Sequence, residues 1–391
     1  MSVFERDEYM ARVSKTKASM AEKGIDVLIV TDPANMNYLS GYDGWSFYVH
    51  QCLVVAQDHD EPVWIGRAQD ANGAYVTAFL DHANVVGYPD HYVQSTERHP
   101  MDFVADFLKQ RGWDKGTVGS EQDNYYYTAA CQASLEKGLP NASFVDTTAL
   151  VNWVRVVKSE REIGYMRDAA RIMEKVMRLA VNRIEPGMKQ SALAAEIFRA
   201  EVVGTDGYGG GYPGILPPLM PTGDASNAPH LTWTDKEFVA GEGTIYELGT
   251  TRHQYHCPMA RTVYLGKAPT VVSDTAKVVV EGLNAALDFA KPGVTAEQIE
   301  EAWRGVISKH GLEKESRIGY SIGVNYPPDW GEHTISLRPK DKTVMQPGMT
   351  MHCIPSLWIQ NWGIEISESF RITETGSEVF CDFPRQLFEK D

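Results

Sequence analysis

The chain has 391 residues, of which 43% are hydrophobic, 33 are glycine and 20 are proline. At roughly 100–200 residues per domain this length predicts two or three domains with hydrophobic cores, and the composition excludes collagen-like and disordered chains. The formal net charge of −15 argues against a nucleic acid as a partner, because phosphate binding requires a basic surface.

Cysteine usage and hydropathy favour a cytoplasmic protein. The five cysteines are an odd number and form no Cys-x-x-Cys pair, so we expect neither a disulfide framework nor a cysteine zinc site. The sequence has no run of about 18 apolar residues that could span a membrane, and its opening, MSVFERDEYMARVSK, lacks an apolar signal core. We therefore expect a cytoplasmic location and no membrane partner.

The first part of the chain, up to about residue 150, alternates between helix and strand patterns. Residues 5–23 are helical in pattern and end before Gly24, and residues 25–32 (IDVLIVTD) are typical of a buried strand. Further strands are predicted at 51–58, 61–66 and 116–122, and a helix at 99–113. This alternation predicts an α/β domain with a central sheet.

A domain boundary is expected near residue 155, before a long amphipathic helix. Ser159 can cap this helix and Glu162 follows three residues later, which is the capping-box pattern. Apolar residues then recur at helical spacing, at Ile163, Met166, Ala170, Met173 and Met177. We assign residues 1–155 to an N-terminal domain and residues 156–391 to a C-terminal domain.

The second half contains a weak internal repeat. Segments that begin at Ala170 and Ala276 align without a gap, so that Pro186-Gly187 matches Pro292-Gly293. Each segment reads as a helix, a Pro-Gly turn and a second helix, and is followed by strands. The repeat predicts an α/β (α+β) domain built from two related halves, and a binding site between the halves is expected because pockets form at such interfaces.

Six motifs occur in order along the chain. They are NMNYLSGYDGWSFY (35–48), VRVVKSEREIGYMRDAA (154–170), TGDASNAPH (222–230), IYELGT (245–250), RIGYSIGVN (317–325) and QPGMTMHCIP (346–355). Together they resemble the creatinase, aminopeptidase P and prolidase family across nearly the whole chain. The resemblance implies a creatinase-like N-terminal α/β domain and a pita-bread catalytic domain. It also implies a homodimer, in which the N-terminal loop of one subunit approaches the active site of the other.

The metallopeptidases of this family hold two metal ions with five acidic or histidine ligands. By resemblance the first ligand position is Glu247, which is still acidic. The other four positions fall, in order, on Pro258, Tyr320, Ile354 and Ser367, and an additional family histidine falls near Tyr326 and Pro327. One carboxylate alone cannot hold two ions about 3.5–4 Å apart. We therefore expect a metal-free member without a cofactor, like creatinase.

A single ion held by rearranged residues is the alternative. The candidate ligands are His253, His256, Cys257 and His352. His253 and His256 are three residues apart on a strand or turn, where such side chains point to opposite sides. A metal shared by these two is therefore disfavoured, and a surface or hydrogen-bonded core role is the simpler interpretation.

Without metal ions, the substrate must be electrophilic by itself. The carbon of an amidinium or guanidinium lies between two nitrogens that share a positive charge, and this charge also attracts a carboxylate. Glu247 can attack such a carbon directly or activate a water molecule; the alternative is a structural acid paired with Arg261 or Arg252. His230, at the family's histidine position, can carry a proton to the departing amine.

Substrate binding is assigned to aromatic side chains and to charged groups near the later motifs. A small planar cation suits an aromatic cage, which contributes about 2 kcal/mol where water is excluded. The aromatic candidates, each of which can also be a core residue, are Tyr320, Tyr255, Trp45, Phe47, Tyr48, Trp330, Trp358 and Trp362. Glu365 shares a strand face with Ser367 and can supply a second carboxylate, whereas Glu368 faces the other way unless the strand bulges. Arg261 or Arg371 is a candidate for binding a substrate carboxylate.

These residues indicate a metal-independent hydrolase that opens a C–N bond of a small amidine, which also carries a carboxylate. Three alternatives remain open: a creatinase-like amidinohydrolase, a metal-dependent Xaa-Pro peptidase with unusual ligands, and an inactive pita-bread binding module. The retention of Glu247 and His230 argues against an inactive module.

Overall fold

The computed structural model describes residues 3–216 and 218–391, which form two compact units that meet between Arg155 and Val156. The architecture is mixed α/β, as the sequence predicts. None of the helices in the described parts of the chain combines the length and the apolar character that a membrane crossing requires.

The N-terminal unit contains a six-stranded mixed sheet with the strand order β4-β3-β2-β1-β5-β6. Its strands are β1 (Val27–Val30), β2 (Cys52–Ala56), β3 (Val63–Arg67), β4 (Val85–Tyr88), β5 (Thr117–Ser120) and β6 (Ser143–Asp146). The pair predicted at 51–58 and 61–66 is confirmed as the antiparallel pair β2 and β3. The strand predicted at 116–122 is β5, which runs parallel to β1.

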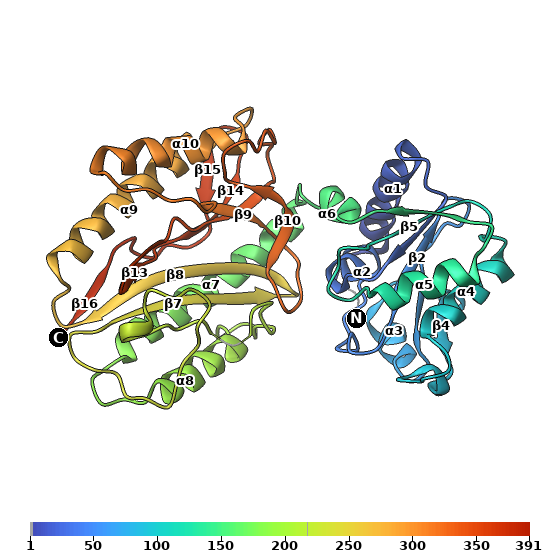
Figure 1. Ribbon diagram of the computed structural model, residues 1–391, viewed down its shortest axis with the longest axis horizontal. Coiled ribbons are helices and arrows are strands. Elements are labelled where there is room, and N and C mark those ends of the chain that lie inside the picture. Colours follow the sequence, from blue (N-terminus) through green and yellow to red (C-terminus); the bar gives the residue numbers. More distant parts are fainter. Residues whose placement is uncertain (1–2, 217) are drawn as a thin grey trace. The chain divides into compact units, whose positions relative to one another are not determined.

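Helices lie on both sides of this sheet (Figure 1). They are α1 (Arg6–Glu22), α2 (Pro33–Ser40), α3 (Ala71–Thr77), α4 (Pro100–Arg111), α5 (Ala129–Gly138) and α6 (Leu150–Val154), with short 3₁₀ turns at His82–Asn84 and Asp90–Tyr92. Val27 and Ile29 belong to the same buried cluster as residues of α4 and α5. Their alternation along β1 places one face of the sheet against these two helices.

The C-terminal unit contains two helix pairs of similar build. The pairs are α7 (Glu160–Arg183) with α8 (Gln190–Val203), and α9 (Thr270–Phe289) with α10 (Ala296–Ile307); 3₁₀ turns lie at Gly223–Ala225 and Ser308–His310. Gly187 and Gly293 in the two connecting turns have positive φ angles of 84° and 87°, which glycine adopts without strain. The capping box of Ser159 and Glu162 is present at the start of α7.

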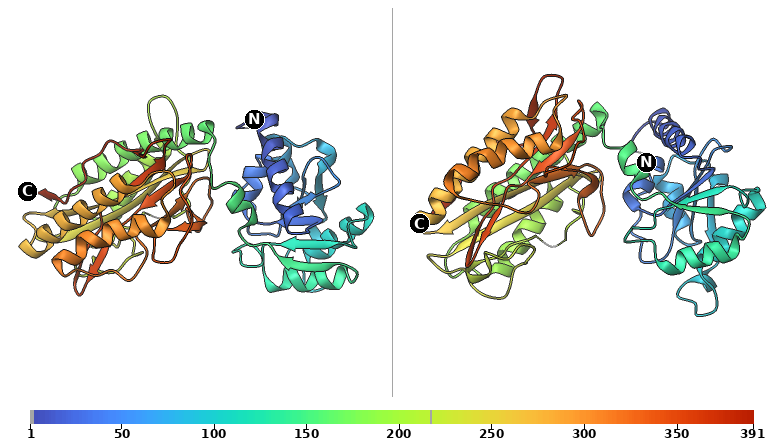
Figure 2. Two further views of the ribbon diagram at one scale, coloured as in Figure 1. Left: turned by 90° about the horizontal axis from the view of Figure 1, so that it is seen from above. Right: turned by 45° about the horizontal axis from the view of Figure 1, so that its top comes forward.

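Strands lie between the two helix pairs of this unit, as Figure 1 and the tilted view in Figure 2 show. A three-stranded sheet, β16-β8-β7, consists of β7 (Gly243–Arg252), β8 (Tyr255–Leu265) and β16 (Phe388–Lys390). A five-stranded sheet, β10-β9-β11-β14-β15, consists of β9 (Gly319–Ile322), β10 (Gly331–Ser336), β11 (Thr350–Cys353), β14 (Glu368–Ile372) and β15 (Ser377–Val379). A separate hairpin joins β12 (Leu357–Ile359) and β13 (Trp362–Ile364).

Each helix pair packs on its own buried cluster. Residues of α7 and α8 share a core with β7 and β8, whereas residues of α9 and α10 share a core with β10, β11 and β14. The predicted two-part organisation of this domain is therefore visible in its packing, and the strands between the two cores carry the predicted site residues.

The stretch from residue 245 to 263 is confirmed as an antiparallel hairpin of β7 and β8. Its turn residues, His253 and Gln254, both have positive φ angles (50° and 62°), as a tight turn between twisted strands requires. The hairpin register places Glu247 opposite Ala260. This register decides which β8 residues lie beside Glu247.

Candidate active site

Glu247 is a buried carboxylate on β7, with only 7% of its surface exposed. Its backbone is fixed on both edges, since it lies opposite Ala260 of β8 and exchanges N–H···O bonds of 3.1 and 3.3 Å with Leu219. In the described parts of the chain, no lysine or arginine forms an ion pair with Glu247. Burial, and next the charge of Asp329, raise the pKa of Glu247 from 4.5 to about 7.

The two arginines that could have made Glu247 a structural ion-pair acid bind elsewhere. Arg261 is fully buried and pairs with Glu368 at 2.6 Å. Its remaining N–H groups donate to the carbonyls of residues 260, 367, 383 and 384. Arg252 donates to the carbonyl of Gly209. The structure therefore does not support pairing of Glu247 with either arginine.

The prediction that Arg261 or Arg371 binds a substrate carboxylate is wrong for Arg261 and unsupported for Arg371. A guanidinium has five N–H donors, and Arg261 uses all of them inside the protein. Arg371 forms ion pairs with Glu160 and Glu378. The register explains the error, because Arg261 points to the opposite face of β8 from Ala260 and Thr262, where Glu368 also lies.

Glu365 is the second buried carboxylate of the site. It is 2% exposed, and its Oε2 atom has no hydrogen-bond partner within the described structure. Thr262 fixes its backbone, because the Glu365 N–H donates to Thr262 Oγ1 at 2.9 Å, and this hydroxyl donates to the Glu365 carbonyl at 3.1 Å. Burial, and next the charge of Glu247, raise the pKa of Glu365 well above its usual value, whereas the charge of Lys314 opposes this rise.

Burial raises the pKa of both Glu247 and Glu365, and the charge of Glu247 raises that of Glu365 further. Two interacting carboxylates with pKa values pushed apart provide an acid and a base in one site. Because the two negative charges repel each other, protonation of one carboxylate favours ionisation of the other. The pair can both engage an electrophilic carbon and donate a proton.

Asp329 adds a third carboxylate near Glu247. Burial alone would raise its pKa, but hydrogen bonds from His333 and from the backbone N–H groups of Trp330 and Gly331 lower it. Asp329 therefore carries a negative charge at neutral pH. It acts on Glu247 at a distance, because its oxygens are occupied by these donors.

Two of the residues at the family's ligand positions are joined by an imidazole. Tyr320 Oη lies 3.3 Å from His352 Nδ1, and Ser367 Oγ lies 2.7 Å from His352 Nε2. Ser367 Oγ also accepts from the N–H of Ala260, and Tyr320 Oη accepts from Trp330 Nε1, each at 2.7 Å. Burial, and next the charge of Arg261, lower the pKa of His352 to about 3, so the imidazole is neutral.

These side chains do not fit a two-metal centre. Pro258 and Ile354 offer no side-chain donor, and the hydroxyls of Tyr320 and Ser367 are engaged by neighbouring groups. Within residues 3–216 and 218–391, the one group of three side chains that could share an ion is His50, His99 and Cys131, in the N-terminal unit. The candidates His253 and His256 are also separated: His256 is buried and Nε2 accepts from the N–H of Gly214, whereas His253 lies in the β7–β8 turn.

His230 is exposed, at the end of the predicted segment. The N–H of Met220 donates to the carbonyl of Leu231 at 2.8 Å, and the adjacent Leu219 pairs with Glu247. These backbone bonds bring the segment that carries His230 towards β7. The structure shows no hydrogen bond between the two described residues His230 and Glu247, so a proton-shuttle role for His230 stays a prediction.

The aromatic candidates are dispersed. Trp330 is 1% exposed, and its ring covers Gly249, where a Cβ would lie 2.6 Å from the ring. Tyr255 is also buried and donates to Glu162 at 2.9 Å, which accounts for it as a core residue. Trp358 and Trp362 are half-buried on the β12–β13 hairpin. In the N-terminal unit, the rings of Trp45 and Phe47 lie 4.5 Å apart, and Trp45 and Tyr48 are exposed.

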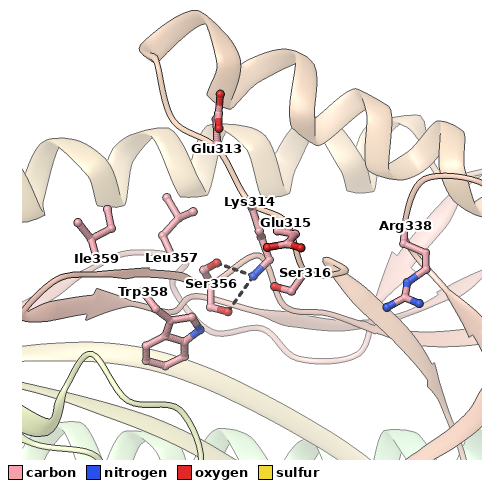
Figure 3. Close-up of a pocket in the computed structure, with 9 residues that line it drawn as sticks. All are labelled: Glu313, Lys314, Glu315, Ser316, Arg338, Ser356, Leu357, Trp358 and Ile359. Carbon is pink, nitrogen blue, oxygen red and sulfur yellow. Dashed lines mark hydrogen bonds between the residues drawn. The ribbon is translucent and has the colours of Figure 1, made fainter.

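Sequence reasoning missed Lys314 and Asp329 as parts of this site. Lys314 lies in the loop before β9, and its ammonium donates to the carbonyl of Ser356 at 2.7 Å (Figure 3). Burial lowers its pKa to about 8 although Glu365 opposes this effect. Neither residue belongs to a periodic pattern or to a ligand position, so the sequence offered no signal for them.

Comparisons with known proteins agree with this architecture. The profile of Metallopeptidase family M24 matches residues 164–374, and that of the Creatinase/Prolidase N-terminal domain matches residues 12–157. A protein named ectoine hydrolase from Halomonas elongata is 48% identical over 394 residues, which cover 99% of this chain and 98% of that protein.

Solved structures of low sequence identity share the fold. Dipeptidase PepE from Mycobacterium ulcerans matches with a TM-score of 0.82 at 21% identity, over 99% of each chain. A prolidase from Thermococcus sibiricus matches with a TM-score of 0.84 at 18% identity, over 97% of this chain and 99% of that one.

We predict that Glu247→Gln stabilises the protein at alkaline pH but not at acidic pH. Because folding raises the pKa of Glu247, its contribution to stability is fully present below 4.5 and is lost as the pH rises through about 7. Glutamine does not ionise, so the variant gains up to about 3 kcal/mol relative to wild type above that pH. Urea unfolding between pH 5 and 8.5 checks this, with the exposed Glu237→Gln as the matched control. A difference between variant and wild type that does not change with pH would contradict the raised pKa.

Proposed function

Since the chain belongs to Metallopeptidase family M24 and carries the Creatinase/Prolidase N-terminal domain, we propose that it is a hydrolase that opens the cyclic amidine ring of ectoine without a resident metal ion. The observation that carries this proposal is a buried Glu247 without a cationic partner, at a position where the family's metallopeptidases hold ions. The similarity to the ectoine hydrolase of Halomonas elongata supports the choice of substrate.

The charge of the substrate complements that of the site. Ectoine carries an amidinium and a carboxylate, and three acids surround the position where the amidinium is proposed to bind: Glu247, Glu365 and Asp329. A cation beside Glu247 favours its ionised form and therefore lowers its pKa. The substrate itself thus supplies the positive charge that metal ions supply in the peptidases. Hydroxyectoine has the same charged groups and is proposed as a second substrate.

The reaction requires the elements of one water molecule. An oxygen adds to the amidine carbon, one of its two C–N bonds breaks, and the released nitrogen takes a proton. The carbon remains on the other nitrogen as an acetyl group, which gives N-acetyl-2,4-diaminobutyrate. Glu247 either attacks the carbon first, after which water adds to that carbon and the bond to Glu247 breaks, or it removes a proton from the attacking water.

Two residues are candidates for donating the proton to the released nitrogen. Glu365, whose pKa is raised well above its usual value, lies within electrostatic reach of Glu247. His230 is the candidate from the family resemblance. The orphan Oε2 atom of Glu365 favours Glu365, because a buried polar atom without a partner is costly unless the substrate completes its hydrogen bonding.

The assembly and location proposed for this enzyme rest on resemblance and composition. We propose a cytoplasmic homodimer in which Trp45, Phe47 and Tyr48 of one subunit approach the substrate of the partner subunit. The exposed rings of Trp45 and Tyr48 support a contact that the isolated chain lacks.

The first prediction from this proposal is that the protein converts ectoine to a product heavier by one water molecule. Wild-type protein is incubated with ectoine, with creatine and with a Xaa-Pro dipeptide, and the products are identified by mass spectrometry. We expect turnover of ectoine alone, and a loss of more than about 10²-fold in Glu247→Gln, because a buried amide replaces the reacting carboxylate. Cleavage of creatine or of the dipeptide in preference to ectoine would overturn the assignment.

The second prediction separates the two proton donors. If Glu365 donates the proton, Glu365→Gln lowers kcat by about 10²–10⁴-fold, although glutamine reproduces the shape and the neutral charge of the protonated acid. His230→Ala then lowers kcat much less. The opposite order would assign the proton transfer to His230 and leave Glu365 with a binding role.

A further inference from the structure

A pocket with a volume of about 530 Å³ opens beside Lys314 in the C-terminal unit (Figure 3). It is lined by residues 313–316 of the loop before β9, by Ser356 and the strand β12, and by Arg338. Its volume lies within the usual range for small-molecule sites, about 300–1,000 Å³. A six-membered ring with a carboxylate substituent is small enough for such a space.

Lys314 brings a positive charge to the wall of this pocket. Its Nζ atom donates to the carbonyl of Ser356 at 2.7 Å and lies 3.4 Å from the hydroxyl of the same residue. Both partners are neutral, and within the described residues Lys314 forms no ion pair. An ammonium group has three N–H donors, so one donor and the full charge remain for an anion.

The β12–β13 hairpin places this charge near Glu365 of the candidate active site, although neither Glu365 nor Glu247 lines the pocket. Leu357 pairs with Ile364, so the next positions along the two antiparallel strands are Ser356 and Glu365. The ammonium group that is anchored on Ser356 is therefore across the hairpin from Glu365. The two side chains also influence each other's charge.

An aromatic wall lies on the same hairpin. Trp358 lines the pocket and its ring covers Gly363, where a Cβ would lie 2.6 Å from the ring. The absence of a side chain at Gly363 is thus what lets the indole lie flat on the hairpin. Trp358 was predicted to bind substrate, and this position offers a flat apolar surface next to Lys314.

Arg338 also lines the pocket, but the other arginines near the site are already engaged. Arg261 is saturated by Glu368 and backbone carbonyls, and Arg371 is paired with Glu160 and Glu378. The guanidinium of Arg317 lies over the ring of Tyr320, 4.5 Å from its centroid. Among the described residues, Lys314 and Arg338 line the pocket without forming an ion pair, and Lys314 is the one whose charge acts on Glu365.

We propose that Lys314, held by Ser356, forms the subsite that binds the carboxylate of a zwitterionic amidine. This inference rests on the proposed function. With its carboxylate on Lys314, the substrate presents its amidinium to Glu365 and Glu247, since opposite ends of the molecule meet opposite charges. Lys314 is thereby a specificity-determining residue that favours amino-acid-derived amidines over amidines without an acid group.

The test compares two substrates in Lys314→Met, which keeps the length of the side chain and removes its charge. The substrates are ectoine and the corresponding 2-methyltetrahydropyrimidine, which has the same amidine ring without the carboxylate. We expect kcat/KM for ectoine to fall about 10- to 100-fold, mainly through KM, in line with the loss of a charged hydrogen bond. For the carboxylate-free ring, kcat/KM should change less than about 3-fold, because the lost group has nothing to bind.

Lys309→Met is the matched control, since Lys309 is exposed in the 3₁₀ turn that precedes the same loop. It should leave kcat/KM unchanged for both substrates, and Lys314→Arg should recover part of the activity on ectoine. If Lys314→Met does not fold, as judged by circular dichroism, Lys314→Gln replaces it. If wild type turns over the carboxylate-free ring too slowly, its inhibition constant against ectoine replaces kcat/KM.

Two outcomes would overturn the inference in different ways. Equal losses for both substrates would show that Lys314 acts on Glu365 and not on the substrate carboxylate. No loss for either substrate would remove Lys314 from the site. If wild type turns over neither compound, the proposed function itself fails, and this result is distinct because it does not depend on the variant.

Discussion

A carboxylate buried without a counter-ion is the constraint on which the candidate site depends. Glu247 is fixed in the middle of β7 by backbone bonds on both edges, so its side chain cannot move to solvent without breaking the strand. Removing a carboxylate from water is costly unless a cation or hydrogen-bond donors replace the water. The arginines nearby bind Glu368 and backbone carbonyls instead, and Asp329 and Glu365 add negative charge. A ligand that carries a positive charge would relieve this cost.

The surroundings of Glu247 differ from the two-metal site that the family resemblance implies. The positions that hold ligands in the family's metallopeptidases carry proline, isoleucine, tyrosine and serine here. Of these, Tyr320 and Ser367 both form hydrogen bonds with the neutral imidazole of His352. Trp330 donates a further hydrogen bond to the hydroxyl of Tyr320, and the N–H of Ala260 donates to that of Ser367. The hydroxyl groups are thus satisfied within the protein, which limits the need for an ion at these positions.

Much of the fold could be predicted from the sequence, because it depends on local patterns. A short stretch of sequence is enough to predict the capping box of Ser159, the Pro-Gly turns of the repeat and the hairpin around Glu247. Glu365 was expected from strand alternation with Ser367, but residues 365–367 connect β13 and β14 and belong to neither strand. The prediction for Arg261 failed because the sequence does not show which face of β8 each residue occupies. Arg261 faces Glu368, whereas Thr262 faces Glu365.

The parts that could not be predicted depend on loops and on pairing between distant segments. Lys314 acquires its place through Ser356, 42 residues away, and Asp329 through a turn that ends next to Trp330. His352 was considered only as a metal ligand, and its role as a bridge between Tyr320 and Ser367 appears only when three strands and a loop are assembled. No local sequence pattern marks these residues, so only the folded structure shows their roles.

The most direct test of the central claim is the metal content of the active enzyme. Protein is treated with a strong chelator, freed of it by gel filtration, and assayed for turnover of ectoine in parallel with elemental analysis of the same sample. The account predicts full activity with far less than one bound transition-metal ion per chain. Activity that disappears with the metal and returns in proportion to added ions would show that Glu247 works as a ligand, and it would contradict the account.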